Sequence, residues 1–149
     1  MKSQELQAHA TKAFQSGLNC AQSVFTTLAP KIGFDFENAR MISSGFGAGM
    51  GRLQQTCGAA TGAFMALSIY HGKKTLDNTE LKTNIYPVIQ EFTTRFEATH
   101  NTLQCKDLIK CDLNTEEGLA YFKNNELFDV VCTKCVKDAV KIANELMNK

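Results

Sequence analysis

The sequence has no excess of charge of either sign and no long apolar run. Lysine and arginine total 16 against 15 aspartate and glutamate residues, which leaves a net charge of +1. Such a chain lacks the basic footprint of a nucleic-acid-binding protein. No apolar stretch approaches the ~20 residues of a membrane-spanning helix, so we expect no membrane span. The first residues, MKSQEL, contain no apolar leader segment, and we therefore expect a cytoplasmic location.

Strand patterns and familiar catalytic arrangements are also missing from the sequence. No segment shows the period-two alternation of a half-buried strand. The glycine-rich residues 45–52 follow no predicted strand and lack a Gly-Lys-Ser/Thr ending, so neither dinucleotide nor phosphate binding is expected. No Ser/His/Asp or paired-carboxylate arrangement is apparent. His71 and His100 fall near predicted helix C-termini, where histidine is common.

Helical periodicity dominates the chain. Apolar residues recur at helical spacing over residues 4–17, 20–29, 36–44, 58–71, 81–96, 103–109, from 115 onward and over 130–147. Pro87 should kink or break its helix, whereas residues 58–71 are apolar nearly all the way round, as in a buried helix. We predict an all-α, single-domain bundle over residues 1–149, with about six to eight helices and a buried central helix near 57–71.

The distinctive chemical feature is a set of six cysteines. The four most widely separated lie where helices are predicted to begin, namely Cys20, Cys57, Cys105 and Cys135. Asn19 is the expected cap of the first of these helices, and Asp129 that of the last. Asp77, with Glu80 three residues on, is expected to form a capping box before the helix that contains residues 81–96. The free N–H groups and the macrodipole at a helix N-terminus favour the thiolate, which attacks disulfides and binds metals. In a reducing cytoplasm such cysteines are more often redox-active or metal-binding than part of a permanent disulfide framework.

Cys57 is the strongest candidate for a functional cysteine. A glycine-rich loop precedes it, and small residues follow at Gly58, Ala59, Ala60 and Gly62, so a partner could approach the sulfur closely. The alternative is a small core residue at a crowded helix crossing. Cys20 has a similar helix terminus, but taken alone it is more often a core residue, and its case depends on Cys57 lying nearby.

The other cysteines are ambiguous. Cys132 and Cys135 form a CxxC, a spacing that serves redox disulfides and metal sites alike, and on a helix both would share the apolar face. Val136 follows, so the CxxCH pattern of haem attachment is absent. Cys105 and Cys111 flank lysines that could lower a thiol pKa or simply be solvated. The wide separations match no compact zinc-finger or ferredoxin spacing, so a shared site must be assembled by the fold.

Taken together, these motifs resemble a known family. The CGAxxG motif Cys57-Gly58-Ala59-Ala60-Thr61-Gly62, the preceding glycine-rich loop and the flanking cysteines are similar to the redox-active proteins named for the C_GCAxxG_C_C pattern. The resemblance places the four characteristic cysteines at Cys20, Cys57, Cys105 and either Cys135 or Cys132. It implies a redox role and, from genes that often neighbour such proteins, an oxidoreductase or transporter component as partner. A further similarity to part of split-Soret cytochromes c implies an iron–sulfur centre, without the haem.

Three classes of function follow. The first is a small cytoplasmic redox protein. It would either cycle between dithiol and disulfide, with catalytic Cys57 as attacking thiolate and Cys20 as resolving partner, or hold an iron–sulfur cluster. The cofactor or metal ligands would be Cys20, Cys57, Cys105 and Cys135, with Cys132 and Cys111 as alternates. The second class is a structural zinc protein with the same ligands, and the third is a helical interaction module whose cysteines are core residues. No haem or nucleotide cofactor is expected.

Overall fold

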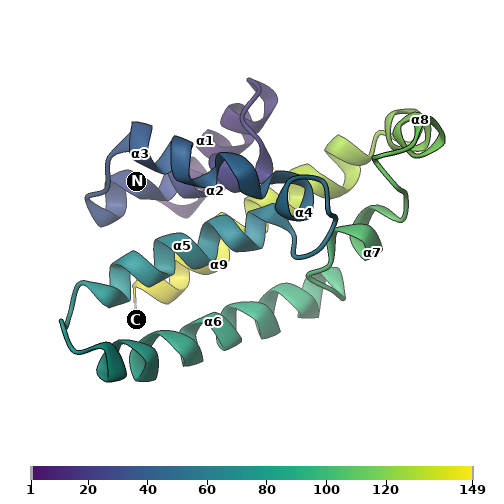
Figure 1. Ribbon diagram of the computed structural model, residues 1–149. Helices are drawn as coiled ribbons and strands as arrows, with labels where there is room; N and C mark the ends of the chain where they lie inside the picture. The colour runs from purple at the N-terminus through teal and green to yellow at the C-terminus, as the bar shows by residue number, and fades with distance from the viewer. Residues whose placement is uncertain (1, 149) are drawn as a thin grey trace.

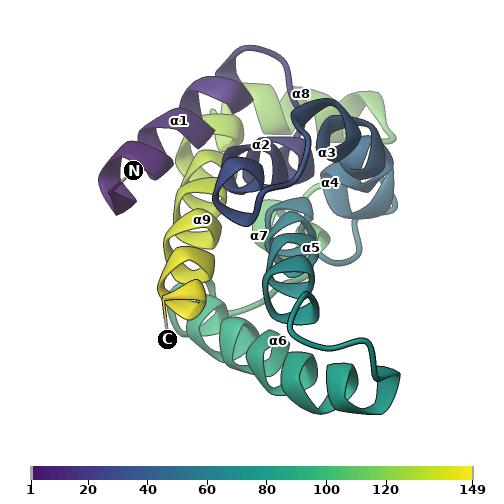
Figure 2. The same cartoon turned by 90° about the vertical axis from the view of Figure 1, so that its left-hand side faces the viewer.

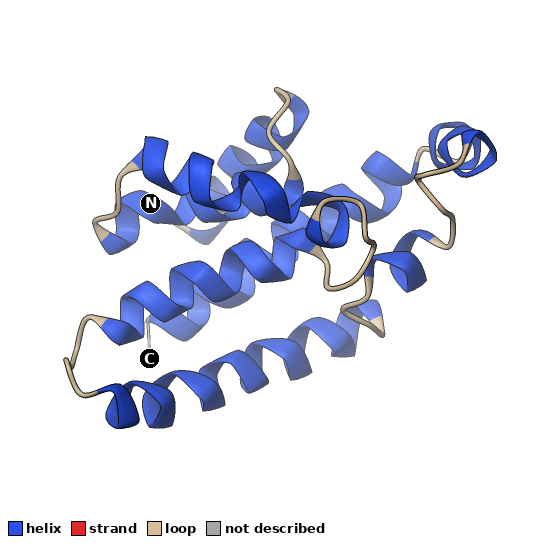
Figure 3. Cartoon of the chain, viewed as in Figure 1, coloured by secondary structure: helices blue, strands red, loops and turns tan. Residues whose placement is uncertain are grey.

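The computed structural model describes residues 2–148, and these contain helices but no strand (Figure 3). Eight helices are found in this part of the chain: α1 (Ser3–Gln15), α2 (Cys20–Leu28), α3 (Phe36–Ser43), α5 (Gly58–Gly72), α6 (Asn78–His100), α7 (Cys105–Ile109), α8 (Glu116–Asn124) and α9 (Thr133–Met147). The segment α4 (Gly47–Met50) is a tight turn, since two of its residues have left-handed backbone angles. The predicted all-α fold and helix number are confirmed. Across residues 2–148, no helix combines the length and the apolar character needed to cross a bilayer.

Helix α5 is the centre of the fold, as the apolar run predicted. It packs against α2 on one side and against α9 and α6 on the others (Figures 1 and 2). Its fully buried side chains are small, apart from one leucine: Ala59, Ala60, Ala63, Ala66 and Leu67. Small side chains let neighbouring helices approach closely. A Cβ atom built on Gly62 would lie only 2.6 Å from the carbonyl oxygen of Ala21 in α2.

Larger side chains from the surrounding helices complete the core. Phe25 of α2 is 1% exposed, and Phe92 and Phe96 of α6 are completely buried. The apolar face of α9 contributes a continuous stripe that includes Val136, Ala139, Val140, Ala143 and Leu146. A smaller apolar cluster forms around Cys105, Ile109 and Leu113, toward α8. The helix ends that carry the cysteines lie between these two clusters.

Two local predictions need correction. Pro87 does not break its helix, since α6 continues through it, and of the two predicted effects only a kink stays a prediction. Pro87 and Thr83 are both exposed, so water can bond the Thr83 carbonyl that the proline leaves unpaired. Asp129 is not an N-cap either, since it lies inside the π-helical segment η3 (Phe128–Cys132), which leads directly into α9. Cys135 therefore lies within a continuous helical stretch rather than at a free helix N-terminus.

Candidate functional site

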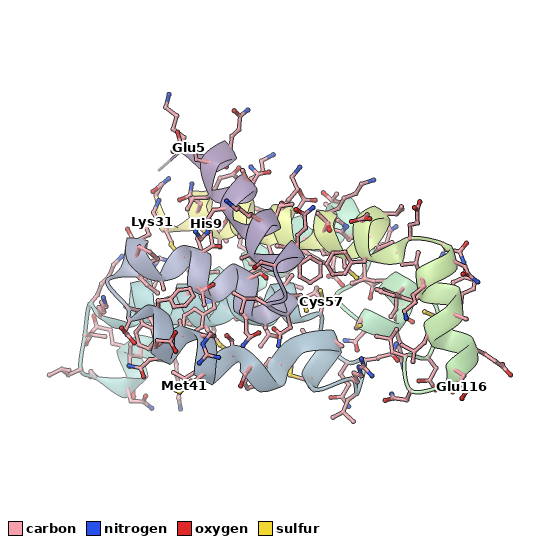
Figure 4. The ribbon with its side chains drawn as sticks, turned by 90° about the horizontal axis from the view of Figure 1, so that it is seen from above. Glu5, His9, Lys31, Met41, Cys57 and Glu116 are labelled. Carbon is pink, nitrogen blue, oxygen red and sulfur yellow. The ribbon has the colours of Figure 1, made fainter. Side chains whose placement is uncertain are left out.

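Five of the six cysteines line one pocket of about 400 Å³: Cys20, Cys57, Cys105, Cys132 and Cys135. The pocket lies where the N-terminal ends of α2, α5 and α7 meet the start of α9. Figure 4 shows Cys57 near the middle of the molecule, while Glu5, Met41 and Glu116 lie at its edges. No disulfide is formed among the described residues, so these cysteines are free thiols. The fold thus brings together residues that the sequence keeps far apart.

The Cys20 end of the pocket is built by a helix cap and a glycine. Asn19 and Gln22 form a reciprocal capping box at the start of α2, with bonds of 2.8 and 3.0 Å. Asn19 Nδ2 also donates to the Ser44 carbonyl at 3.0 Å, which ties α2 to the glycine-rich segment. A Cβ atom on Gly58 would overlap the Cys20 sulfur and lie 2.8 Å from the Phe46 carbonyl oxygen. Only glycine at this position therefore lets α5 pack this closely against Cys20 of α2.

Backbone pairing joins Cys57 to Cys105. The Cys57 N–H donates to the Leu103 carbonyl, and the Cys105 N–H donates to the Gln55 carbonyl, each at 2.6 Å. Gln54, which is only 6% exposed, fixes the next segment of chain. Its Nε2 donates to the carbonyl of Cys111 at 2.7 Å, and its Oε1 accepts from the N–H of Leu113 at 2.8 Å. These hydrogen bonds, all of them to main-chain groups, fix the chain segments that form this wall of the pocket.

Cys57 is the thiol that its surroundings favour as an anion. The thiol of Cys135 donates a hydrogen bond to the Cys57 sulfur, and this bond is the main cause of a lowered Cys57 pKa. The N–H groups of Ala59 and Ala60, at the start of α5, act in the same direction, and burial opposes them. The same hydrogen bond, together with burial, raises the pKa of Cys135. Cys57 is therefore the more acidic thiol of this pair, and Cys135 keeps its proton to higher pH.

The other cysteines do not share this property. Burial raises the pKa of Cys20 to about 11 and that of Cys105 to about 12, and the negative charge of Cys57 acts in the same direction. Burial also raises the pKa of Cys132 and of Cys111. The sequence predicted a favoured thiolate at each helix N-terminus, but a lowered pKa is found at Cys57 alone, and its main cause there is the Cys135 thiol rather than the backbone N–H groups. At the other helix ends, the cost of burying an anion exceeds the gain from the backbone N–H groups.

Sequence reasoning missed one residue of this site, His100. Its Nδ1 lies 3.9 Å from the Cys135 sulfur, and its Nε2 lies 2.7 Å from Oδ2 of Asp138. The ring packs on Phe96, with 4.5 Å between ring centroids. The Asp138 carboxylate accepts a hydrogen bond from the Nε2 N–H, which leaves Nδ1 as the ring nitrogen that faces the Cys135 sulfur. No sequence pattern predicts the contact between His100 and Cys135, since it depends on how the end of α6 packs on α9.

A family model described as "Putative redox-active protein (C_GCAxxG_C_C)" matches residues 18–146, a span that includes all six cysteines. The chain belongs to the C_GCAxxG_C_C family. The resemblance predicted from the CGAxxG motif is confirmed, and the family description agrees with a redox-active protein. No match was found among curated proteins or among solved structures.

In this C_GCAxxG_C_C protein, the four cysteines assigned by the resemblance all line the pocket. Cys132 lines it as well, so both members of the CxxC reach the site, whereas Cys111 lines a neighbouring surface cleft instead. Among residues 2–148, no three histidine, cysteine, aspartate or glutamate side chains are gathered into a group that could hold a metal ion. An iron–sulfur cluster or a zinc ion at these residues stays a prediction.

Proposed function

We propose that this protein is a thiol–disulfide redox protein in which Cys57 attacks and Cys135 completes the disulfide. The placement of both thiols in one pocket, together with a Cys57 pKa that the Cys135 thiol lowers, carries this proposal. Disulfide exchange requires a thiolate as nucleophile, and the lowered pKa makes Cys57 the cysteine of the pocket that forms one most readily. A second thiol in hydrogen-bond contact is the natural resolving partner. Thiols stay reduced in the cytoplasm, which is the location we expect.

The proposed reaction transfers two electrons from the protein to a disulfide substrate. The Cys57 thiolate attacks one substrate sulfur, a mixed disulfide forms, and the first thiolate leaves and takes a proton from solvent. Cys135 then gives its proton to Nδ1 of His100 and attacks the Cys57 sulfur, which releases the second thiolate, and this thiolate takes up the proton from His100. The products are two thiols and a Cys57–Cys135 disulfide. An external dithiol, carried by a partner of the oxidoreductase class, returns the protein to its reduced form.

Disulfide mapping tests the assignment of the resolving cysteine. After treatment with one equivalent of a small disulfide and alkylation of the remaining thiols, peptide mapping is expected to find a Cys57–Cys135 link. Cys135→Ser should trap the mixed disulfide at Cys57, because no thiol remains in contact to displace it. Cys20→Ser should leave the link intact. If instead Cys20→Ser traps the mixed disulfide and Cys135→Ser does not, Cys20 is the resolving partner, as the sequence predicted. If no adduct forms at Cys57, the proposal is wrong.

Replacing His100 tests the proton transfer from Cys135. His100→Gln is expected to slow release of the second thiolate by about 100-fold, a typical effect of losing a general base. The rate of this release step in His100→Gln should also rise toward higher pH, because Cys135, whose pKa is raised, then loses its proton to solvent. Stopped-flow absorbance measures both steps. Alkylation of Cys57 should be unaffected, and His9→Gln, which alters a histidine that contacts the Thr27 hydroxyl rather than Cys135, is the matched control. An unchanged second step in His100→Gln would contradict the role.

Metal binding is the second candidate function, favoured because Cys20, Cys57, Cys105 and Cys135 all line one pocket. Thiolates are common ligands of both zinc and iron–sulfur clusters. Since no three donors are gathered among the described residues, binding would require these side chains to rotate. Anaerobic purification with metal analysis decides between the candidates. Stoichiometric iron with broad visible absorption would make this a cluster protein, and one zinc per colourless chain would make the site structural.

A further inference from the structure

The position of Cys57 limits which disulfides it can attack. Its side chain is only 8% exposed and lies inside the cysteine pocket. A thiolate must reach the target sulfur directly, so the target disulfide has to enter the pocket. The volume of about 400 Å³ is typical of sites for small organic molecules. A disulfide of a folded protein brings two backbone segments, with Cα atoms about 5.5 Å apart, and this bulk would have to enter with it.

The walls of the pocket favour an apolar ligand body. Apart from the cysteines, most lining side chains are aliphatic or aromatic: Phe14, Leu108, Ile109, Leu113, Phe122, Phe128 and Val131. The rings of Phe14 and Phe128 stack on each other, with centroids 4.1 Å apart and planes inclined by 9°. An aromatic or aliphatic group placed among these side chains leaves water and gains the free energy of apolar burial.

One charged residue, Arg52, lines this pocket, and no carboxylate lines it among the described residues. The Arg52 backbone is held at both ends, since its N–H donates to the Gly47 carbonyl at 3.3 Å and its carbonyl accepts from Asn114 Nδ2 at 2.9 Å. Asp107 and Asp112 share an adjoining cleft with Arg52, but no ion pair of Arg52 is formed among the described residues. The guanidinium is therefore available to a carboxylate of a ligand.

We infer that the pocket takes small disulfides that combine an aromatic or aliphatic body with a carboxylate, and that it excludes the disulfides of folded proteins. This inference deepens the proposed function and rests on it. The apolar body would lie against the phenylalanine and leucine side chains, the carboxylate against Arg52, and one disulfide sulfur against Cys57. The reaction is the exchange described above, in which the substrate takes up two electrons and leaves as two thiols.

The test compares substrates of different shape and charge on the reduced full chain. Cys111→Ser serves as the background, because Cys111 lies outside the pocket and its partly exposed thiol would react directly. The probes are dithiobis(nitrobenzoate), which is aromatic with carboxylates, dithiodipyridine, which is aromatic and uncharged, cystamine, which is aliphatic and cationic, and insulin. Each rate is divided by that of glutathione with the same disulfide. We expect the relative rates to fall in the order given, with insulin reduced no faster than by glutathione.

Substitution of Arg52 tests the proposed contact with the ligand carboxylate directly. Arg52→Gln is expected to lower the rate with dithiobis(nitrobenzoate) about fivefold, the scale of one partly exposed ion pair, and to leave dithiodipyridine unchanged. Lys106→Gln is the matched control, since Lys106 lines the adjoining cleft but not the cysteine pocket, and it should change neither rate. Equal effects of the two substitutions would overturn the carboxylate assignment.

Alkylation by iodoacetamide separates failure of this inference from failure of the proposed function. Iodoacetamide is small enough to reach Cys57 without fitting the pocket. If Cys57 is alkylated rapidly but insulin reacts as fast as the aromatic disulfides, the substrate class is wrong and the exchange function stands. If Cys57 reacts neither with iodoacetamide nor with any disulfide, the exchange function is wrong and the inference falls with it.

Discussion

Replacing Cys57 with serine (Cys57→Ser) is expected to reduce disulfide exchange by at least about 1,000-fold, the scale of losing a catalytic nucleophile. A serine hydroxyl stays protonated near neutral pH and does not attack sulfur. No other cysteine of the pocket can take over, because burial raises the pKa of Cys20, Cys105 and Cys132. The measurement is release of thiol from a small disulfide under single-turnover conditions. Both proteins carry Cys111→Ser, so that the partly exposed thiol outside the pocket does not contribute.

The pH dependence of alkylation checks the same assignment. The reactive species is the thiolate, and the Cys57 pKa is below the ordinary thiol value of 9.0. Alkylation of Cys57 should therefore reach its plateau below that pH, while alkylation of Cys20 should keep rising until about pH 11. Peptide mapping of samples alkylated across this range gives both curves. A Cys57 curve that coincides with that of Cys20 would contradict the assignment of Cys57 as the attacking thiolate.

Gly62→Ala is expected to lower the free energy of unfolding by about 2 kcal/mol, through overpacking at a helix contact. The new Cβ atom would lie 2.6 Å from the Ala21 carbonyl oxygen and 3.2 Å from the Val24 Cβ, so α2 and α5 must move apart. This strain exceeds the ~1 kcal/mol that alanine gains over glycine within a helix. Because α2 carries Cys20 and α5 follows Cys57, the substitution should also disturb the pocket.

Urea denaturation of wild type and variants measures this effect. Gly72→Ala is the matched control, since it makes the same change in the same helix. Its Cβ atom would meet only the ends of two flexible side chains, Leu81 at 3.4 Å and Ile85 at 3.7 Å. We expect Gly72→Ala to stay within about 0.5 kcal/mol of wild type, as is usual for substitutions away from strained sites. If Gly62→Ala were equally stable, the two helices would not be packed as closely as the structure has them.

Helix boundaries were the most predictable part of this protein. Asn19 was expected to cap α2, and it forms a full capping box. Asp77 was also expected to form one, and it does accept from the N–H groups of Thr79 and Glu80. The reciprocal bond is missing, because the Glu80 carboxylate accepts from the Thr75 hydroxyl instead. Caps involve residues within one helical turn of each other, so their chemistry is visible in a short stretch of sequence.

Predictions from the sequence failed where the result depends on the tertiary surroundings of a residue, that is, on its burial and on its contacts with distant helices. The break expected at Pro87 does not occur, because its helix face is exposed to water. Thiolate character was expected at four helix ends, and it is found at Cys57 alone because burial dominates at the others. His100 was regarded as an ordinary residue at a helix C-terminus, yet it contacts Cys135 and Asp138. Neither burial nor contact between distant helices can be seen in a sequence pattern.

The sequence by itself determined the all-α class, the buried central helix and the set of cysteines whose chemistry matters. Apolar periodicity and helix caps depend on residues a few positions apart, so these features follow from local patterns. Only the tertiary structure decided that five cysteines share one pocket, that Cys135 contacts Cys57, and that Cys111 lies outside. Those outcomes depend on how α2, α5, α6 and α9 pack, because packing decides which distant side chains meet and which charges lose water.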